Sequence, residues 1–164
     1  MTPHLAFIGL GSNLENPRSQ LLRAFTALGE LPGTRLVAQS SLYRSAPLGN
    51  PDQPDFINAV AKIETALIPQ ALLQALLQIE HSHGRERTFR NAPRTLDLDI
   101  LLYDDMQLHE QGLTIPHPQM HLRAFVLQPL LEIAPDASIP AVGQASRAMQ
   151  DCHDQSLERL ADAA

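Results

Sequence analysis

The sequence predicts an α+β fold, with a ferredoxin-like βαββαβ core and additional C-terminal helices. Two observations lead to this prediction. Apolar segments of strand type and amphipathic segments of helical period follow one another in the order β-α-β-β-α-β, and helical patterns recur near residues 121–133 and 144–161. No repeat, low-complexity tract or linker interrupts the chain, so we expect a single domain over residues 1–164.

The first strand and the first helix of the expected core lie near the N-terminus. Residues 5–10 form an apolar run, as in a buried strand, and a "GSN" tripeptide ends it. Pro17 suits the first position of the helix that follows, and Asn16 before it can cap that helix. Gly29 or Gly33 is expected to end the helix, because glycine readily adopts the left-handed conformation common after a helix.

The remaining core elements follow in order along the chain. Residues 34–44 and 55–64 show loosely alternating apolar positions, which predict the second and third strands. Pro69 opens the second helix and Gly84 stops it. Residues 95–103 then predict the fourth strand and complete the core.

Composition and charge narrow the classes to which the protein can belong. The net charge of −6 argues against a nucleic-acid partner, because binding a phosphate backbone needs clustered positive charge. A single cysteine, Cys152, excludes a disulfide framework and a cysteine metal cluster. No signal peptide is recognisable, and no stretch approaches the ~20 apolar residues of a membrane span. We therefore expect a cytoplasmic protein with no membrane partner; a monomer is expected as well, although these observations do not bear on it.

Two aspartates within the fourth strand are unusual, since aspartate is depleted in strands. Side chains alternate between the faces of a strand, so one face is expected to carry Leu96, Leu98, Ile100 and Leu102, and the other Asp97, Asp99, Leu101 and Tyr103. The two like charges repel each other unless a cation lies between them, and hard carboxylate oxygens suit Mg²⁺. The alternative is an exposed sheet face. Asp104 and Asp105, which follow the strand, are interpreted as turn formers.

An arginine-rich segment precedes this strand, with Arg85, Arg87, Arg90 and Arg94 inside ten positions of an acidic chain. Arginine binds phosphate through a planar, bidentate fork, whereas lysine serves solubility equally well, and this chain has one lysine. Arginines followed by paired carboxylates favour phosphoryl transfer, which depends on positioning and charge neutralisation. The alternative is a solvated loop.

The common nucleotide-binding motifs are missing. There is no G-x-x-x-x-G-K-[ST] sequence and therefore no P-loop. The "GLGSNL" segment has Gly9 and Gly11 but Leu14 where a dinucleotide fingerprint needs a third glycine, so this segment is interpreted as a tight turn after the first strand.

Several segments together resemble 6-hydroxymethyl-7,8-dihydropterin pyrophosphokinases of folate biosynthesis. They are "GLGSNL", "SSLYRSAPLG", "DQPDFINAV", "PRTLDLDILLYDD" and "LTIPHPQMHLRAFVLQPL", and the resemblance runs from about residue 5 to residue 136. It implies a ferredoxin-like core and an ATP-dependent enzyme that transfers pyrophosphate to the pterin hydroxymethyl group and releases AMP.

The resemblance also implies the residues of the active site. Asp97 and Asp99 are expected to hold two Mg²⁺ ions and to act in catalysis with an arginine loop. The residues expected to contact ATP are Glu80, Arg85, Arg87, Arg94, Ile100, Thr114, His117 and Arg123. The residues expected to contact the pterin are Ser45, Ala46, Leu48, Phe56, Asn58 and Phe125, with the two phenylalanines stacked on the ring. For both phenylalanines, core packing is the alternative that the residues alone leave open.

The chain departs from the family pattern at several positions of the expected site, among them Leu77 and Pro118 near ATP, a position in the arginine loop and a position beside the pterin. Relatives often have a tryptophan in the arginine loop, whereas this chain has none and Asn91 lies near that position. Phe56 stands where a tyrosine is common, which removes a hydroxyl group and keeps the stacking face.

Two other functions share parts of this pattern. A Mg²⁺-dependent phosphohydrolase would use the same aspartates and arginines without a pterin slot. A ferredoxin-like RNA-binding module would need basic residues and stacking aromatics on the sheet face, where this chain has aspartates.

Overall fold

The computed structural model describes residues 3–13, 16–46, 55–83 and 96–160, and it shows a mixed α/β protein built on an antiparallel sheet. The strands of the main sheet are β1 (His4–Ser12), β2 (Thr34–Gln39), β3 (Tyr43–Ser45), β4 (Phe56–Thr65), β5 (Asp97–Tyr103) and β10 (Glu158–Arg159). The α-helices are α1 (Pro17–Gly29), α2 (Pro69–Ser82), α3 (Ala124–Ile133) and α4 (Ala145–Gln150). The predicted strand and helix order of the core is thus confirmed, within a few residues at each boundary.

The strand order in the main sheet is β10-β3-β4-β1-β5, with β2 also paired to β4. Residues 34–44 therefore form two short strands instead of the single one predicted, and both pair with β4. Ser40 lies between them, and its hydroxyl oxygen accepts a hydrogen bond from the Val60 N–H at 2.9 Å. β4 is the longest strand and extends along both β2 and β3.

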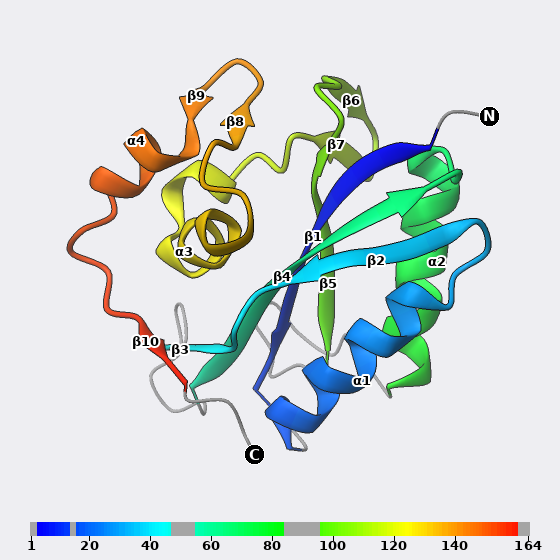
Figure 1. Ribbon diagram of the computed structural model, residues 1–164, viewed down its shortest axis with the longest axis horizontal. Coiled ribbons are helices and arrows are strands. Elements are labelled where there is room, and N and C mark those ends of the chain that lie inside the picture. The colour runs from blue at the N-terminus through cyan, green and yellow to red at the C-terminus, as the bar shows by residue number, and fades with distance from the viewer. Residues whose placement is uncertain (1–2, 14–15, 47–54, 84–95, 161–164) are drawn as a thin grey trace.

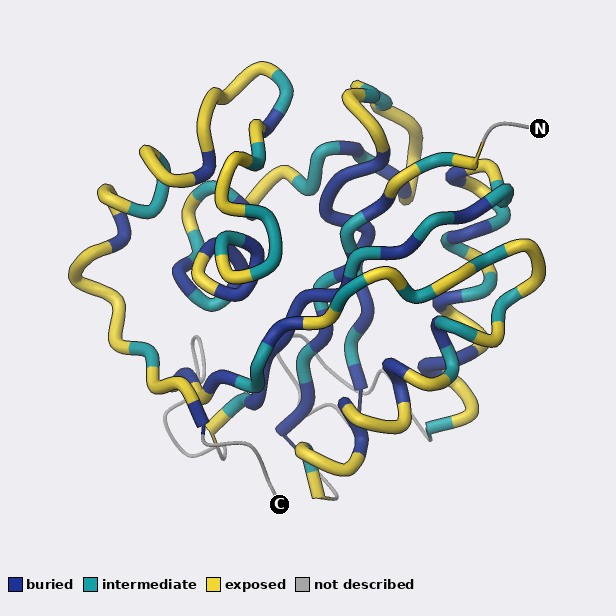
Figure 2. The backbone as a smooth tube through the Cα atoms, in the orientation of Figure 1, coloured by how far each residue is buried: buried dark blue, intermediate teal, exposed yellow. Residues whose placement is uncertain are grey.

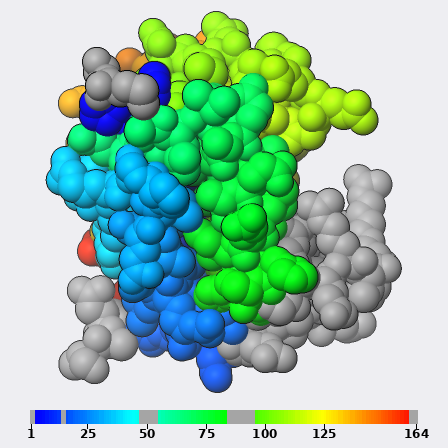
Figure 3. Space-filling view, turned by 90° about the vertical axis from the view of Figure 1, so that its right-hand side faces the viewer, coloured from blue at the N-terminus to red at the C-terminus, as the bar shows by residue number. Residues whose placement is uncertain are grey.

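Helices cover both faces of the sheet (Figure 1). One face packs against α1 and α2, with Leu21, Phe25, Leu72 and Leu76 among the buried residues of that core. Figure 3 shows these two helices side by side on one side of the molecule. The other face packs against α3, with Leu127 and its neighbours in a second core. The central strands lie buried between the two helical layers (Figure 2).

The start of α1 agrees with the sequence, although its cap does not. Asn16 precedes the helix as predicted, but its φ of 61° is left-handed and its side chain makes no capping hydrogen bond. The Asn16 carbonyl instead accepts the first helical hydrogen bond, from the Gln20 N–H at 3.0 Å. The helix ends at Gly29, and Gly33 adopts a left-handed φ of 59° in the turn that follows.

Of the two helical patterns predicted in the C-terminal region, the one near residues 121–133 is confirmed by α3, and the one over residues 144–161 is largely wrong. A 3₁₀ turn at Met120–Leu122 precedes α3, and the helical pattern over residues 144–161 forms only the short helix α4. The chain then turns, and β10 pairs with β3 at the sheet edge. The open edge of β3 offers hydrogen-bond partners that a longer helix would leave unused, which explains the strand.

Two hairpins complete the described part of the chain: β6 (Leu108–Glu110) with β7 (Leu113–Ile115), and β8 (Ser138–Ile139) with β9 (Gly143–Gln144). None of the helices in the described ranges has the length and apolarity that a membrane crossing requires.

Candidate active site

Four strands bring candidate residues to one end of the sheet, on the face that packs against α3. Gly11 of β1 pairs with Asp97 of β5 on one side and with Asn58 of β4 on the other. Tyr43 of β3 continues this row beyond Asn58. Because directly paired residues in antiparallel strands share a face, Asp97, Gly11 and Asn58 form a row across it.

The two glycines of "GLGSNL" lie within β1, so the predicted tight turn at this position is wrong. Gly9 pairs with Asp99, just as Gly11 pairs with Asp97. A Cβ atom on Gly11 would lie 3.5 Å from Asn58 Oδ1 and 3.9 Å from Phe56 Cδ1. Gly11 therefore leaves bare backbone between Asp97 and Asn58, whereas a Cβ atom on Gly9 would meet the Leu101 side chain at 3.2 Å. Because the two glycines are two residues apart in one strand, they share a face of the sheet.

Asp97 and Asp99 are half-buried and point to the same face of β5, as predicted. The backbone between them is held from the other side of the strand. Glu80, at the end of α2 and only 3% exposed, accepts a hydrogen bond from the Leu98 N–H at 2.7 Å. A buried carboxylate at this position ties α2 to the part of β5 that carries the aspartates.

The predicted alternation of β5 fails after Ile100. The register with β1 shifts between Phe7 and Ile8, so β5 bulges, and Leu101 and Leu102 both join the core against α3. Tyr103 consequently faces the opposite core, where its hydroxyl donates to the Leu67 carbonyl at 2.5 Å. An irregularity of this kind is typical of a bulge, which places an extra residue in one strand.

His117 lies near enough to both Asp97 and Arg123 to be influenced by their charges. Its backbone N–H donates to the Leu101 carbonyl at 3.0 Å, which fixes the segment after β7 against β5. Burial and the charge of Arg123 lower the pKa of His117, while Asp97 acts in the opposite direction. The Gln119 N–H donates to His117 Nδ1 at 3.1 Å, so the neutral ring carries its proton on Nε2.

Arg123 and Phe125 bring the two predicted halves of the site together. The Arg123 guanidinium carbon lies 5.5 Å from the centroid of the Phe125 ring, within the range of a cation–π contact. Arg123 immediately precedes α3, and Phe125 is in its first turn. Arg123, which is expected to contact phosphate, therefore packs on Phe125, which is expected to contact the pterin.

The predicted pterin contacts on the sheet are also neighbours. Asn58 is 4% exposed and its amide donates to Ser45 Oγ at 2.7 Å. Its Oδ1 lies on the side of Gly11 and has no hydrogen-bond partner among the residues that the structure describes. Phe56 is half-buried beside Ser45, and Ala46, which follows β3, is exposed. A buried amide oxygen without a partner is costly, so this atom is suited to a ligand.

The other predicted residues lie further from the row of Asp97, Gly11 and Asn58, have only their backbone available, or fall outside the described ranges. Ile100 is in β5 with its side chain in the core against α1 and α2, so only its backbone is available to a ligand. Thr114 is in β7 of the β6–β7 hairpin. This hairpin lies near the end of β5 opposite to the aspartates. Four predicted residues lie outside the described residues: Leu48, Arg85, Arg87 and Arg94.

The donor set suits Mg²⁺. Two carboxylates on neighbouring positions of one strand face supply hard oxygen ligands. Within the described ranges, no group of three or more histidine, cysteine or acidic side chains could hold a metal ion. The remaining ligand positions would therefore be left for water and substrate phosphates, which is the usual manner of Mg²⁺ binding.

Glu132 and its partners were missed by the sequence reasoning. Glu132, near the end of α3, accepts hydrogen bonds from Tyr43 and Ser41 on the β3 side of the sheet. A single glutamate on an amphipathic helix gives no sequence signal of such a role, because the partners lie about ninety residues away.

Comparison with known proteins agrees with this geometry. The model of the family "7,8-dihydro-6-hydroxymethylpterin-pyrophosphokinase" matches residues 7–135. A 2-amino-4-hydroxy-6-hydroxymethyldihydropteridine pyrophosphokinase of Haemophilus influenzae is 54% identical over 135 residues, which are 82% of this chain and 84% of that protein. The protein of the same name from Pseudomonas aeruginosa is 48% identical over 154 residues, 94% of this chain and 95% of that protein.

Solved structures show the same fold at low sequence identity. A crystal structure of Plasmodium falciparum HPPK-DHPS has a TM-score of 0.72 at 14% identity and covers 91% of this chain. An HPPK-DHPS in complex with substrates has a TM-score of 0.73 at 12% identity and covers 92% of this chain. This chain spans less than half the length of those two solved chains, 44% and 43%. From the family match and the close relatives together, the chain belongs to the 7,8-dihydro-6-hydroxymethylpterin-pyrophosphokinase family.

Proposed function

We propose that this chain transfers the pyrophosphoryl group of ATP to 6-hydroxymethyl-7,8-dihydropterin and releases AMP, the reaction named by its family. One observation carries the proposal. The row of Asp97, Gly11 and Asn58 puts a carboxylate and a buried amide on the same face, separated by about two strand spacings, or ~10 Å, with the bare backbone of Gly11 between them. ATP, held at the carboxylate, and the flat pterin, held at the amide, can meet above this stretch of backbone.

The pterin is proposed to bind between Phe56 and Phe125. Stacking on two aromatic faces suits a flat heterocycle, and such contacts add to the burial of ring area. The Asn58 amide, oriented by Ser45, pairs with the polar edge of the ring. The bare backbone at Gly11 leaves room for the ring beside Asn58.

The phosphates of ATP are proposed to lie against Asp97, Asp99, His117 and Arg123. The two aspartates would hold Mg²⁺, which when bound neutralises phosphate charge and stabilises the transition state. Arg123 offers a planar fork for phosphate oxygens, and the Nε2–H of His117 can donate to another. Contacts from Arg85, Arg87, Arg94 and Leu48, which lie outside the described residues, stay predictions, as do those of Glu80, Ile100 and Thr114.

In the reaction, the pterin hydroxymethyl oxygen attacks the β-phosphorus of ATP in line. The new O–P bond forms as the bond from the β-phosphorus to the oxygen shared with the α-phosphate breaks. AMP leaves with that oxygen, and the hydroxyl proton passes to water. The residues of the site contribute by holding both substrates in this geometry and by spreading the developing charge.

The core is proposed to be ferredoxin-like within a single domain over residues 1–164. The order β3-β4-β1-β5, with every neighbouring pair antiparallel, supports this description. The monomeric state, the cytoplasmic location and the absence of nucleic-acid and membrane partners stay predictions.

Incubation of the protein with ATP and Mg²⁺, with and without 6-hydroxymethyl-7,8-dihydropterin, tests the proposal. AMP formation that depends on the pterin is the expected result. Release of phosphate from ATP without pterin would instead indicate a phosphohydrolase, and no turnover of ATP would contradict both.

A further inference from the structure

A hydrogen-bond network joins the end of α3 to β3. Both oxygens of Glu132 accept from the Ser41 N–H at 3.0 Å, and one also accepts from the Ser41 hydroxyl at 2.9 Å. The other oxygen accepts from the Tyr43 hydroxyl at 2.6 Å. We call Ser41, Tyr43, Glu132 and Arg159 the Glu132 clasp.

The pKa shifts of Glu132 and Tyr43 indicate which of the two groups is charged at neutral pH. Burial alone would raise the pKa of Glu132, but the hydrogen bonds from Tyr43 and Ser41 and the charge of Arg159 outweigh it and lower that pKa. Burial and the hydrogen bond to Glu132 raise the pKa of Tyr43 to about 12. An ionised carboxylate therefore accepts from a neutral phenol at neutral pH, which is a strong, charge-assisted hydrogen bond.

The C-terminal strand closes the clasp. The Arg159 guanidinium lies 3.7 Å from Glu132 Oε2 and also donates to Ser41 Oγ at 3.1 Å. β10 is fixed beside it by pairing with β3 and by the hydrogen bond from the Leu160 N–H to the Leu42 carbonyl at 2.9 Å. The family match ends at residue 135, so Arg159 reaches back onto the shared fold from a segment beyond it.

Both elements held by the clasp carry predicted pterin contacts. In β3, Ser45 lies two residues after Tyr43, on the same face, and orients the Asn58 amide. In α3, Phe125 precedes Glu132 by seven residues, which is about two helical turns, so both side chains lie on the same side of the helix. A shift of α3 relative to β3 would therefore move Phe125 relative to Asn58.

We propose that Tyr43, Glu132 and Arg159 are positioning residues that set the width of the pterin slot through Phe125 and Asn58. They do not touch the substrate. This inference rests on the proposed function and adds that the C-terminal strand takes part in substrate recognition.

The test measures the KM for each substrate in the variants Tyr43→Phe, Glu132→Gln and Arg159→Gln, with melting temperatures recorded alongside. We expect the KM for the pterin to rise by roughly threefold or more, since a shift in contact geometry weakens binding on one side of the site. The KM for ATP should stay within about twofold of the wild-type value, because Asp97, Asp99 and His117 lie on elements that the clasp does not hold, and only Arg123, at the start of α3, would move with Phe125. Arg159→Lys, which keeps the charge, should recover part of the loss.

Arg35→Gln is the matched control. Arg35 forms an ion pair with Glu64 at 3.0 Å, between β2 and the end of β4 remote from Phe56. Its loss removes a similar exposed charge pair and should leave both KM values unchanged.

Two results would overturn the inference: an unchanged pterin KM in all three variants, or a parallel rise of both KM values together with a lower melting temperature. If Glu132→Gln does not fold, the surface-accessible pair Arg159→Gln and Arg159→Lys decides by itself. A wild-type protein that forms no AMP with pterin would refute the proposed function, whereas an active wild type with unaffected variants would refute only the clasp.

Discussion

Asp97 and Asn58 are both direct cross-strand neighbours of Gly11, one from each side of β1. The backbone of a single glycine therefore separates the carboxylate predicted to serve ATP from the amide predicted to serve the pterin. This relationship makes Gly11 the most direct test of the site's geometry.

Gly11→Val is expected to weaken pterin use while leaving the fold intact. A Cβ at this position meets Asn58 Oδ1 at 3.5 Å, and the two methyl groups of valine would extend into the space beside it. β-branched residues favour strands, so the melting temperature should not fall much. We expect the pterin KM to rise by about tenfold or more, in line with a steric obstacle in a bound geometry.

Gly29→Ala provides the control for this change. It also replaces a glycine, at the end of α1, where the new Cβ meets Leu36 Cβ at 3.5 Å. Its pterin KM should equal that of the wild type. If Gly11→Val has wild-type kinetics, the bare backbone of β1 is not the floor of the pterin site.

Asp97→Asn and Asp99→Asn are expected to lower kcat by on the order of 100-fold, because each removes charge from a carboxylate proposed to hold Mg²⁺. The Mg²⁺ concentration for half-maximal activity should rise in both variants. Magnesium titrations at fixed ATP measure this directly.

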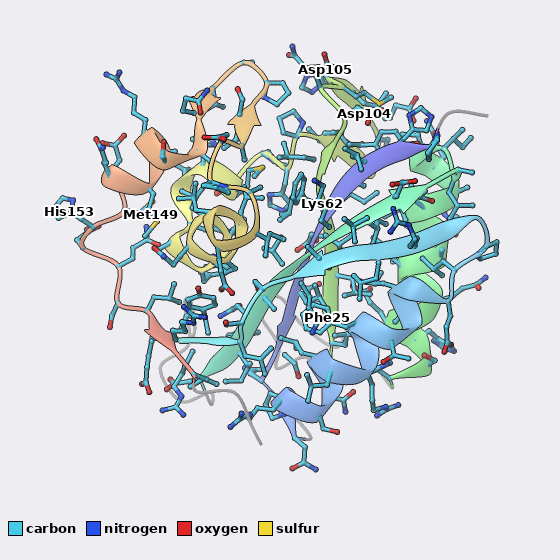
Figure 4. The ribbon with its side chains drawn as sticks, viewed as in Figure 1. Phe25, Lys62, Asp104, Asp105, Met149 and His153 are labelled. Atoms are coloured by element: carbon cyan, nitrogen blue, oxygen red, sulfur yellow. The ribbon has the colours of Figure 1, made fainter. Side chains whose placement is uncertain are left out.

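Asp105→Asn is the matched charge control. Asp104 and Asp105 form the turn predicted after β5, and Figure 4 shows both beside the β6–β7 hairpin, at the opposite end of β5 from Asp97. This variant should have the wild-type magnesium dependence. An equal shift in all three variants would mean that overall charge, and not the pair on β5, governs the response.

Phe125→Ala is expected to raise the pterin KM strongly and the ATP KM only a few-fold. The loss of a stacking face affects the pterin, while the loss of the cation–π contact at 5.5 Å affects how Arg123 is held. Such a contact contributes about 0.5–1 kcal/mol at an exposed site, which corresponds to about two- to fivefold.

Phe7→Ala removes a similar contact elsewhere, since the Lys62 amino group lies 5.8 Å from the Phe7 ring centroid. Both phenylalanines are half-buried beside the core that faces α3. Similar losses for pterin in the two variants would assign Phe125 to core packing, the alternative that its sequence context leaves open.

The pKa of both tyrosines is raised above the ordinary value, and that of Tyr43 reaches about 12. Burial and the hydrogen bond to Glu132 raise the pKa of Tyr43 to about 12, and burial and Asp104 raise that of Tyr103. The folded protein then binds more protons than the unfolded chain above pH 10, so its stability is fully present below pH 10 and falls as pH rises toward 12.

The phenolate absorbance of the two tyrosines, in a chain without tryptophan, measures this titration. Glu132→Gln should lower the Tyr43 pKa, because the variant removes the neighbouring negative charge. A half-maximal phenolate signal at pH 10 in the wild type would contradict the structure of the clasp.

Local sequence signals account for most of the core. The prolines at 17 and 69 mark the first residues of α1 and α2, since proline is favoured there and nowhere else in a helix. The face of Asp97 and Asp99 followed from the period of two in a strand, which holds over the regular part of β5. It failed at Leu102 and Tyr103 because a bulge is decided by the partner strand, whose register shifts between Phe7 and Ile8.

Contacts between segments that are distant in the sequence could not be predicted from local sequence signals. The pattern over residues 144–161 contains helical spacing, but Glu158–Arg159 forms a strand because the edge of β3 is open beside it. Tyr43 and Glu132 are 89 residues apart and meet only when α3 packs on the sheet.

The sequence by itself determined the core element order, the paired aspartates on one strand face and, through its motifs, the family. Each of these depends on residues close together in the chain, where propensity and periodicity act. The tertiary structure alone decided that Gly11 lies between Asp97 and Asn58, that Arg123 packs on Phe125, and that Arg159 reaches Glu132. These depend on strand register and helix docking, which are set by the burial of two whole cores and not by any local pattern.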